Sequence, residues 1–352
     1  MREIGLQPQV LICRTENPLD RDVRQKLSMF CSVSEKAVIE ARDVEHTVYE
    51  YPLMLHAEGL DELVCDLLHL KTPEPDLANW RKFVERVVSP KKRVKIAVVG
   101  KYIDLQDAYK SIYESLTHAA ASQDCGIDLK LIDAESLQDG VDGQLKDVAG
   151  VLIPGGFGER GVEGKIKAAR FAREHKVPYL GLCLGMQVAT IEFARNVCGI
   201  ENANSTEFDK DAPEPVISLL EEQRGVRNKG ASMRLGTWPT KIASGTLAEK
   251  IYGSDEVLER HRHRYEFNMK YRDRMTEKGF HDLGNITRRH ARGADRVARS
   301  SVFRRLPVSS RVSKQAEQTT SALQRIYSGL SRASSGRCAA RRNRSIIAAP
   351  SP

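Results

Sequence analysis

Several common features are missing from this sequence of 352 residues. No run of about 18 apolar residues occurs, so the sequence offers no candidate for a membrane-spanning helix. Residues 1–10 lack the charged start and apolar run of a signal peptide, and we expect no secretory leader. The seven cysteines are odd in number and irregularly spaced, which argues against a disulfide framework. This use of cysteine indicates a reducing compartment, and we expect a cytoplasmic protein.

The formal net charge of +8 is unevenly distributed. Residues 280–352 hold 15 Lys and Arg against 3 Asp and Glu, a net charge of +12. Residues 1–279 hold 40 against 44, a net charge of −4. The tail is rich in Arg, Ser and Ala and poor in large apolar residues, which predicts disorder. A basic tail can bind nucleic acid without sequence preference, but the mildly acidic body disfavours nucleic acid as an evolved partner.

From Val94 onward, apolar segments of strand length alternate with segments of helical periodicity. This alternation is typical of a doubly wound α/β fold with a parallel sheet. In such sheets the chemistry lies at the carboxyl ends of the strands. The predicted divisions of the chain are an α/β remnant at 1–70, a linker at 71–93, a complete α/β domain at 94–279 and a tail at 280–352.

The segment Gly181–Gln187, Gly-Leu-Cys-Leu-Gly-Met-Gln, is the most informative one. It places a Gly-x-Cys-x-Gly pattern at the junction of a predicted strand and a predicted helix, where glycines permit a tight, strained turn. Cys183 would lie at a helix N-terminus, where the helix dipole favours a thiolate. The pattern therefore predicts a nucleophile, and a buried structural cysteine is the alternative.

A second glycine-rich loop, Pro154–Gly158, follows the preceding strand and is predicted to lie beside Cys183. A tetrahedral intermediate needs two backbone N–H donors directed at its oxyanion. Leu184, immediately after the nucleophile, can supply one, and Gly156 can supply the other. Two such loops on adjacent strands favour acyl transfer over a structural role for the cysteine.

Together these motifs resemble the class I glutamine amidotransferases, and further segments are similar to one family among them, the CTP synthases. These segments are Ile4–Pro8, Ile12–Arg14, Asp43–Val44, Phe157–Gly161, Glu163–Lys165, Glu201–Phe208, Met233–Gly236 and Glu259–Glu266. The resemblance covers residues 1–279 almost continuously. It implies a doubly wound amidotransferase domain preceded by the end of an α/β synthetase domain.

The resemblance also implies a reaction in two parts. The amidotransferase domain releases ammonia from L-glutamine through a thioester on Cys183. The synthetase domain phosphorylates UTP with MgATP, and ammonia then displaces the phosphate to give CTP. The residues that match the family's glutamine site are Gly156, Leu184, Gly185, Met186, Gln187, Glu207 and Arg264. In the synthetase part, Lys26 would face UTP, while the ATP site would be lined by Arg42, Asp43 and Val44. A homotetramer is implied as well.

Simpler interpretations of single residues stay open. Without the resemblance, Glu207 and Arg264 could form an ordinary surface ion pair, and Lys26 could be a solvated side chain. His261 and His263 are two residues apart, but no Cys or further His lies at ligand spacing. We therefore expect no metal site.

Two parts of the family's pattern are missing. No Gly-x-x-x-x-Gly-Lys-[Ser/Thr] segment occurs, and Met1 aligns inside the synthetase domain. We therefore expect a fragment that holds no cofactor of its own and does not make CTP alone. The Gln-Phe-His-Pro-Glu motif that supplies the family's general base is also missing. A cysteine nucleophile needs a histidine to take its proton and a carboxylate to orient that histidine, so we expect an impaired catalyst.

A shift of reading frame explains the missing motif. Residues 307–312 can be encoded as CCA GTT TCA TCC CGA GTT. The same bases from the second position give CAG TTT CAT CCC GAG, which encodes Gln-Phe-His-Pro-Glu. In that frame the histidine falls at Ser309 and the glutamate at Arg311. The hypothesis fails if the codons of the gene do not contain this motif in another frame.

Two other functions compete with a CTP synthase fragment. An amidotransferase that serves GMP or anthranilate synthesis would share the Cys183 motif, but residues 1–70 and His261–Glu266 argue against it. A glutamine- or nucleic-acid-binding protein with a basic tail and impaired catalysis is favoured by the missing His and Glu.

Overall fold

The computed structural model describes residues 2–138, 140–219, 234–245, 247–280, 284–287 and 297–298. The chain forms two compact units, one of residues 1–92 with 124–126 and one of residues 93–123 with 127 onward. We call them the N-terminal unit and the amidotransferase unit. The boundaries predicted at residues 70, 93 and 279 remain predictions. In the described part of the chain, no helix has both the length and the apolar character needed to cross a bilayer.

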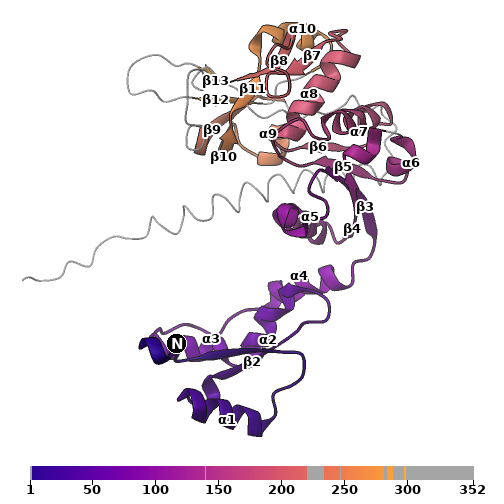
Figure 1. Ribbon diagram of the computed structural model, residues 1–352. Helices are drawn as coiled ribbons and strands as arrows, with labels where there is room; N and C mark the ends of the chain where they lie inside the picture. Colours follow the sequence, from indigo (N-terminus) through magenta and orange to yellow (C-terminus); the bar gives the residue numbers. More distant parts are fainter. Residues whose placement is uncertain are drawn as a thin grey trace, which may run out of the picture. The chain divides into compact units, whose positions relative to one another are not determined.

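The N-terminal unit is built on two parallel strands that carry short helices (Figure 1). Its elements are η1 (Arg2–Ile4), β1 (Leu11–Thr15), α1 (Arg21–Cys31), η2 (Glu35–Ala37), β2 (Val38–Arg42), η3 (Val48–Glu50), α2 (Tyr51–Ala57), α3 (Leu60–Leu67) and α4 (Ala78–Val88). Helix α1 begins where it does because the Asp20 side chain accepts a hydrogen bond from the Val23 N–H at 2.7 Å.

Helix α4 lies within the predicted linker and packs on the N-terminal unit. The Trp80 indole N–H donates to the Tyr49 carbonyl at 2.8 Å. The rings of Tyr49, Trp80 and Phe83 form an aromatic cluster with centroids 5.0–6.1 Å apart. These contacts therefore fix α4 to the N-terminal unit.

The amidotransferase unit contains a sheet of strand order β4-β3-β5-β6, in which β3, β5 and β6 run parallel. Its first elements are β3 (Arg93–Gly100), η4 (Gln106–Tyr109), α5 (Lys110–Ser122), β4 (Gly126–Asp133), η5 (Glu135–Gln138), α6 (Asp142–Leu145), β5 (Gly150–Ile153), α7 (Val162–Glu174), β6 (Tyr179–Gly181) and α8 (Leu184–Asn196). The α/β fold class predicted from the sequence is confirmed.

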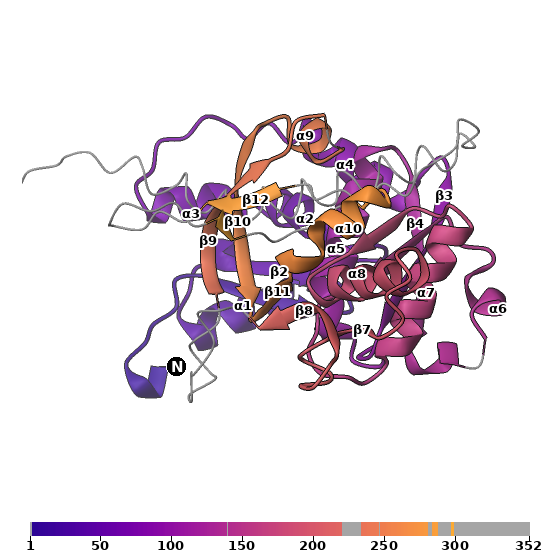
Figure 2. The ribbon, with the colours of Figure 1, turned by 90° about the horizontal axis from the view of Figure 1, so that it is seen from above.

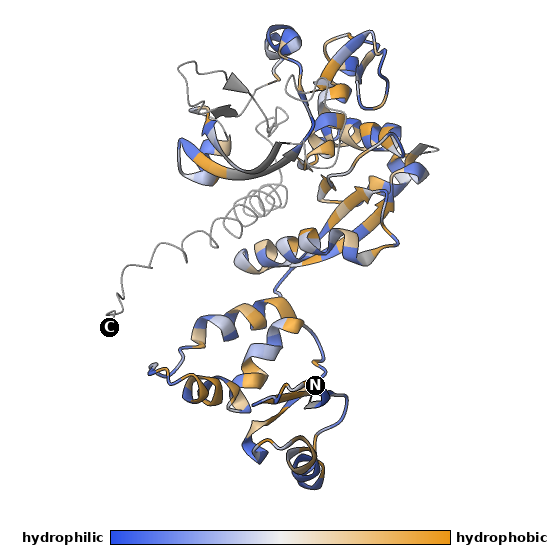
Figure 3. Ribbon diagram, turned by 60° about the vertical axis from the view of Figure 1, so that its left-hand side comes forward, coloured by the Kyte–Doolittle hydropathy of each residue, from blue (hydrophilic) through white to orange (hydrophobic). Residues whose placement is uncertain are grey.

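The core of this unit lies between the sheet and the neighbouring helices α7 and α8 (Figures 1 and 2). Alternate residues of β3 and β5, such as Val99 and Ile153, face this core and are fully buried. Intervening residues such as Val98 and Leu152 are also fully buried. Because both faces of these strands are covered, hydrophobic residues follow one another directly from Ile96 to Val99 and from Val151 to Ile153, whereas the helices alternate between hydrophobic and hydrophilic stretches (Figure 3).

Two further sheets, one of four strands and one of three, complete the described part of this unit. Their strand orders are β11-β8-β7 and β10-β9-β12-β13. Their elements are β7 (Ala203–Ser205), β8 (Glu214–Leu219), β9 (Arg234–Ile242), α9 (Leu247–Tyr252), β10 (Glu256–His263), β11 (Tyr265–Phe267), η7 (Met269–Tyr271), α10 (Arg272–Glu277), β12 (Gly284–Thr287) and β13 (Val297–Ala298). Phe280 joins the main core, with its ring 5.4 Å from that of Phe193.

Candidate active site

The nucleophile predicted from the sequence lies in a strained turn between β6 and α8. Cys183 has φ 53° and ψ −104°, a conformation that costs a non-glycine residue about 1–3 kcal/mol. Such strain persists only where the surroundings fix it. The Leu182 N–H donates to the Ile153 carbonyl at 2.9 Å, and the N–H groups of Met186 and Gln187 donate to the Cys183 carbonyl at 3.0 and 3.2 Å. The turn is thus held from both sides.

The two glycines of the motif allow β6 and α8 to approach closely. A Cβ at Gly181 would lie 2.5 Å from the Gly185 carbonyl, and a Cβ at Gly185 would lie 2.2 Å from the Ile153 carbonyl oxygen. Neither position can hold a side chain without moving backbone. The Tyr179 hydroxyl also donates to the Gly185 carbonyl at 2.6 Å. The glycine pattern read from the sequence therefore reflects close packing around Cys183.

The second glycine-rich loop lies beside the nucleophile, as expected from the order of the strands. A Cβ at Gly155 would lie 3.3 Å from Cys183 Cβ, and one at Gly156 would lie 3.5 Å from Leu184 Cδ2. The backbone N–H groups of Leu184 and Gly156 lie close enough to the Cys183 sulfur to lower the pKa of its thiol. These are the two donors that the sequence predicted for an oxyanion, and the structure brings them to the reactive atom.

The Cys183 thiol is in its neutral form at rest. Burial raises the pKa of Cys183, and the negative charge of Glu207 raises it further. The N–H groups of Leu184 and Gly156 oppose this rise without cancelling it. A nucleophilic role consequently needs a group that takes the thiol proton.

Glu207 lies close to the nucleophile, after β7. Its Oε1 accepts the Gly158 N–H at 2.8 Å. Burial raises the pKa of Glu207, while the Gly158 N–H and the positive charges of Lys101 and Arg264 lower it. Of the two residues predicted to hold an amino-acid substrate, Glu207 is thus within range of Cys183, and Arg264 is within range of Glu207.

Sequence reasoning missed two residues of this site, Lys101 and Tyr265. The Lys101 ammonium donates to the Phe157 carbonyl and acts on Glu207. The charges of Glu207 and Arg264 act on the Tyr265 hydroxyl, whose pKa burial raises. A signal for Lys101 was present, because it directly follows the strand that ends at Gly100, and residues at the carboxyl ends of parallel strands gather at one edge.

Met186 and Gln187, the remaining predicted glutamine contacts, lie in the first turn of α8 and are buried. The Met186 sulfur accepts a hydrogen bond from the Thr190 hydroxyl at 3.5 Å. Gln187 is 4% exposed, and its side-chain oxygen has no hydrogen-bond partner among the described residues. A buried acceptor in this state is suited to a donor from a substrate.

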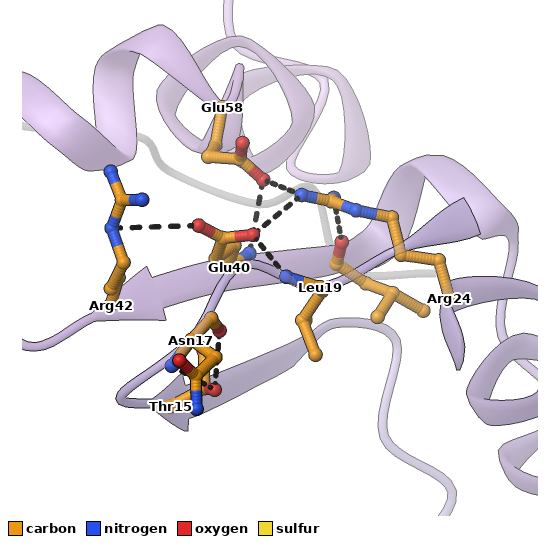
Figure 4. Close-up of polar contacts among 8 residues, drawn as sticks. Thr15, Asn17, Leu19, Arg24, Glu40, Arg42 and Glu58 are labelled. Carbon is orange, nitrogen blue, oxygen red and sulfur yellow. Dashed lines mark hydrogen bonds and ion pairs between the residues drawn. The ribbon is translucent and has the colours of Figure 1, made fainter. Parts of the chain in front are cut away.

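The predicted nucleotide contacts lie in the N-terminal unit, at the end of β2 and on α1. The Arg42 guanidinium lies 4.0 Å from Glu40 (Figure 4). Glu40 also accepts the Leu19 N–H at 2.7 Å, and its own N–H donates to Glu58, which pairs with Arg24 at 2.8 Å. This network ties β2 to α1 and to the end of α2.

Asp43 and Val44 directly follow β2. The Asp43 carboxylate accepts from Arg14 at 2.7 Å and from the Tyr51 hydroxyl at 3.4 Å, and the hydrogen bond from Arg14 lowers the pKa of Asp43. Lys26 is exposed on α1 and makes no hydrogen bond or ion pair to another described residue. Arg42, Asp43 and Val44 thus follow one another at the end of β2, whereas Lys26 lies on α1 and takes no part in the contacts of Arg42 and Asp43.

Some predictions fall on residues that the structure does not describe. Met233, Ser309 and Arg311 lie outside the described residues, as does most of the predicted tail. His261 and His263 lie on β10, paired with Gly236 and Arg234 of β9. The described residues contain no group of three or more His, Cys, Asp or Glu side chains placed to hold a metal ion.

Comparison with known proteins places both units. The family described as glutamine amidotransferase class-I matches residues 104–289, and the CTP synthase N-terminus matches residues 1–70. The chain is 50% identical to a CTP synthase of Syntrophus aciditrophicus over 285 residues, 81% of this chain and 53% of the relative. It is 52% identical to that of Methanocaldococcus jannaschii over 286 residues, 79% of this chain and 53% of the relative. The chain therefore spans about half the length of these curated relatives.

A solved structure gives the same result. The glutaminase domain of Trypanosoma brucei CTPS, with bound acivicin, is matched with a TM-score of 0.55 and 32% identity. The match covers 68% of this chain and 94% of that domain. The chain accordingly belongs to the class I glutamine amidotransferases and, among them, to the CTP synthase family.

Proposed function

We propose that the amidotransferase unit binds L-glutamine and forms a thioester with it on Cys183. The observation that carries this proposal is the close approach of the Gly155–Gly156 loop to Cys183 and Leu184, which brings the Leu184 and Gly156 N–H groups and the Glu207 carboxylate within range of the Cys183 thiol. Glu207 would accept the α-amino group of glutamine and Arg264 would hold its α-carboxylate. Leu184, Gly185, Met186 and Gln187 would form the wall around the side-chain amide.

The proposed chemistry has two steps. The Cys183 sulfur attacks the side-chain amide carbon, and the two N–H groups stabilise the oxyanion that forms. The carbon–nitrogen bond then breaks, and the proton lost by the thiol ends on the departing nitrogen, which leaves as ammonia. Water next cleaves the thioester and restores the thiol, giving glutamate. Cys183 and the oxyanion donors are among the described residues. The general base would be the histidine that the alternative reading frame encodes.

For the intact enzyme we propose glutamine-dependent conversion of UTP to CTP with MgATP, in a homotetramer. The family membership and the match of residues 1–70 support this proposal. Within this chain, Arg42, Asp43 and Val44 would line the ATP site and Lys26 would face UTP. The described residues do not form a metal-ligating group, so we assign magnesium no contact here.

A second candidate is a glutamine-binding protein with impaired catalysis. One support for this candidate is the raised pKa of the Cys183 thiol. The other is that the described groups acting on this thiol belong to Leu184, Glu207 and Gly156, and none of them is an imidazole. Such a protein would bind glutamine through Glu207 and Arg264 but release ammonia slowly.

The first test is covalent labelling of Cys183 in the full chain. We compare, at each thiol, the rate of alkylation by a chloroketone analogue of glutamine with the rate of alkylation by iodoacetamide. This ratio is expected to be at least about tenfold higher at Cys183 than at the partly exposed Cys13 and Cys31, because Cys183 lies beside oxyanion donors. Peptide mass spectrometry identifies the labelled residue. Cys183→Ser is expected to abolish this selective labelling. Equal selectivity at Cys13 or Cys31 would contradict the proposal.

Glu207→Gln tests glutamine recognition. The amide oxygen can still accept the Gly158 N–H, so the loop keeps its contact while the negative charge is lost. The loss of a charge-assisted hydrogen bond to an α-amino group is expected to weaken glutamine binding roughly 10- to 100-fold. The measurement is the glutamine concentration that protects Cys183 from iodoacetamide. Glu201→Gln, at an exposed carboxylate six residues away, is the matched control, and an equal effect there would refute the role.

A further inference from the structure

A buried lysine lies at the base of the glycine-rich loop, and the proposed mechanism does not use it. Lys165 is in the first turn of α7 and is only 2% exposed. Its ammonium nitrogen lies 3.5 Å from the Arg160 carbonyl oxygen, at the end of the loop that carries Gly156. Lysine is among the residues that are almost never fully buried unless they are paired. The position therefore calls for a physical reason.

Close packing of α7 explains why the Lys165 side chain does not reach water. A Cβ at Gly164 would lie 1.7 Å from the Ala134 carbonyl oxygen, and one at Gly161 would lie 2.9 Å from Ala134 Cβ. The start of α7 is thus pressed against the segment that follows β4. Lys165 is buried, as are its neighbours Ile166 and Ala168 on α7.

Four charged groups face the Lys165 ammonium from the neighbouring elements. Lys101 follows β3, Asp133 ends β4, Glu135 begins η5, and Arg160 belongs to the loop itself. Burial lowers the pKa of Lys165 to about 8, the positive charges of Lys101 and Arg160 add to the fall, and Asp133 and Glu135 oppose it. The ammonium is therefore charged at neutral pH in surroundings that disfavour its charge.

The Arg160 carbonyl is linked to the oxyanion donor through a short series of contacts. The Arg160 guanidinium donates to the Lys101 carbonyl, and the Lys101 ammonium donates to the Phe157 carbonyl, adjacent to Gly156. A group that fixes Arg160 hence restricts the backbone from Phe157 to the start of α7. Gly158 and Gly161, with φ of 78° and 71°, give this segment alternative conformations unless it is held.

We propose that Lys165 is a positioning residue whose charged ammonium, by holding the Arg160 carbonyl, keeps the Gly156 N–H directed at Cys183. This inference rests on the proposed glutaminase function of the same site. The interaction is strongest while the amine is protonated, because a hydrogen bond from a charged donor is about twice as strong as a neutral one. Oxyanion stabilisation is accordingly expected to weaken as the pH rises past the point where Lys165 loses its proton.

Lys165→Met tests the proposal, since methionine keeps an unbranched stem in the core and removes the charge. The readout is the ratio of two rates at Cys183, alkylation by the chloroketone of glutamine over alkylation by iodoacetamide, followed from roughly pH 6 to 10. The iodoacetamide rate corrects for ionisation of the thiol. Near neutral pH the variant ratio is expected to be about tenfold below that of the unmodified chain. Above the Lys165 pKa of about 8, the ratio of the unmodified chain is expected to fall to the level of the variant.

Thermal unfolding separates positioning from simple structural support. The fold releases the Lys165 proton at about pH 8 and the unfolded chain does so near the usual 10.5, so the unfolded state binds more protons between these values. The Lys165 side chain therefore stabilises the fold least at neutral pH and more as the pH rises through this window. Lys165→Met is expected to have a Tm at neutral pH equal to or above that of the unmodified chain, while its labelling ratio is lower.

Lys167→Met, at an exposed position on the same helix, is the matched control and is expected to leave both readouts unchanged. A constant reduction of the ratio at every pH, together with a lower Tm, would show a merely structural role. An unchanged ratio would overturn the proposal outright. If the unmodified chain shows no selective labelling at Cys183, the proposed glutaminase function fails instead.

Discussion

Gly164→Ala is expected to destabilise the amidotransferase unit by about 3 kcal/mol or more. The added Cβ would lie 1.7 Å from the Ala134 carbonyl oxygen and 2.8 Å from its carbonyl carbon. Both are backbone atoms, so no side chain can rotate away and the start of α7 must move. Because α7 carries the core residues Val162 and Phe171, this movement also loosens the main core. Chemical denaturation of the full chain, followed by a probe in this unit, measures the change.

The matched control is Gly143→Ala on α6. A Cβ there meets nothing within 4 Å, and the backbone φ lies outside the region reserved for glycine. Alanine at such a position is expected to be neutral or to stabilise by about 0.4–1 kcal/mol, through a less flexible unfolded chain. If Gly164→Ala and Gly143→Ala unfold at the same denaturant concentration, the close approach of α7 to Ala134 does not exist in solution.

Restoring the alternative reading frame over residues 280–352 is expected to raise the rate of glutamine hydrolysis about 100- to 10,000-fold. The restored chain carries Gln-Phe-His-Pro-Glu, with its histidine at position 309 and its glutamate at position 311. The physical reason is the burial of Cys183, which raises the pKa of the thiol and keeps it neutral without a base. The measurement is the rate of ammonia release from glutamine by the restored chain, divided by the rate for the original chain.

Two controls isolate the histidine from the rest of the restored segment. Cys183→Ser in the restored chain is expected to remove the gain. The single change Ser309→His in the original frame is expected to give little, because the surrounding sequence that would place the imidazole is absent. The gene itself offers an independent check at the codons for residues 307–312. If they exclude Gln-Phe-His-Pro-Glu in every frame, the basic tail is genuine and the second candidate function is favoured.

Much of the site was readable from the sequence because its signals are local. The Gly-x-Cys-x-Gly pattern identified the strained turn at Cys183, and the structure shows why each glycine is needed. The alternation of strands and helices predicted from Val94 onward appears in the elements from β3 to α8, since continuous apolar runs of strand length suit a sheet covered on both faces. The start of α7 at Val162 has a weak helical signal, because Gly161 directly precedes the helix and Gly164 lies in its first turn.

Other parts of the site depend on chain segments that are distant in sequence. Lys101 acts on Glu207 across 106 positions of the sequence, although nothing in the segment around either residue points to the other. Glu207 was assigned through the family resemblance, and only the structure places its carboxylate on the Gly158 N–H. Lys165 was noted as part of a motif, but its burial could not be read there, because lysine at a helical position is usually solvated.

The sequence by itself determined the fold class and the family and predicted Cys183 as the nucleophile, because hydrophobic periodicity and glycine-dependent turns are properties of short segments. Only the tertiary structure decided which groups act on Cys183 and in which protonation state they rest. Burial and the distances between charges set the pKa values of Cys183, Glu207 and Lys165. These quantities exist only once strands and helices from separate parts of the chain have packed together.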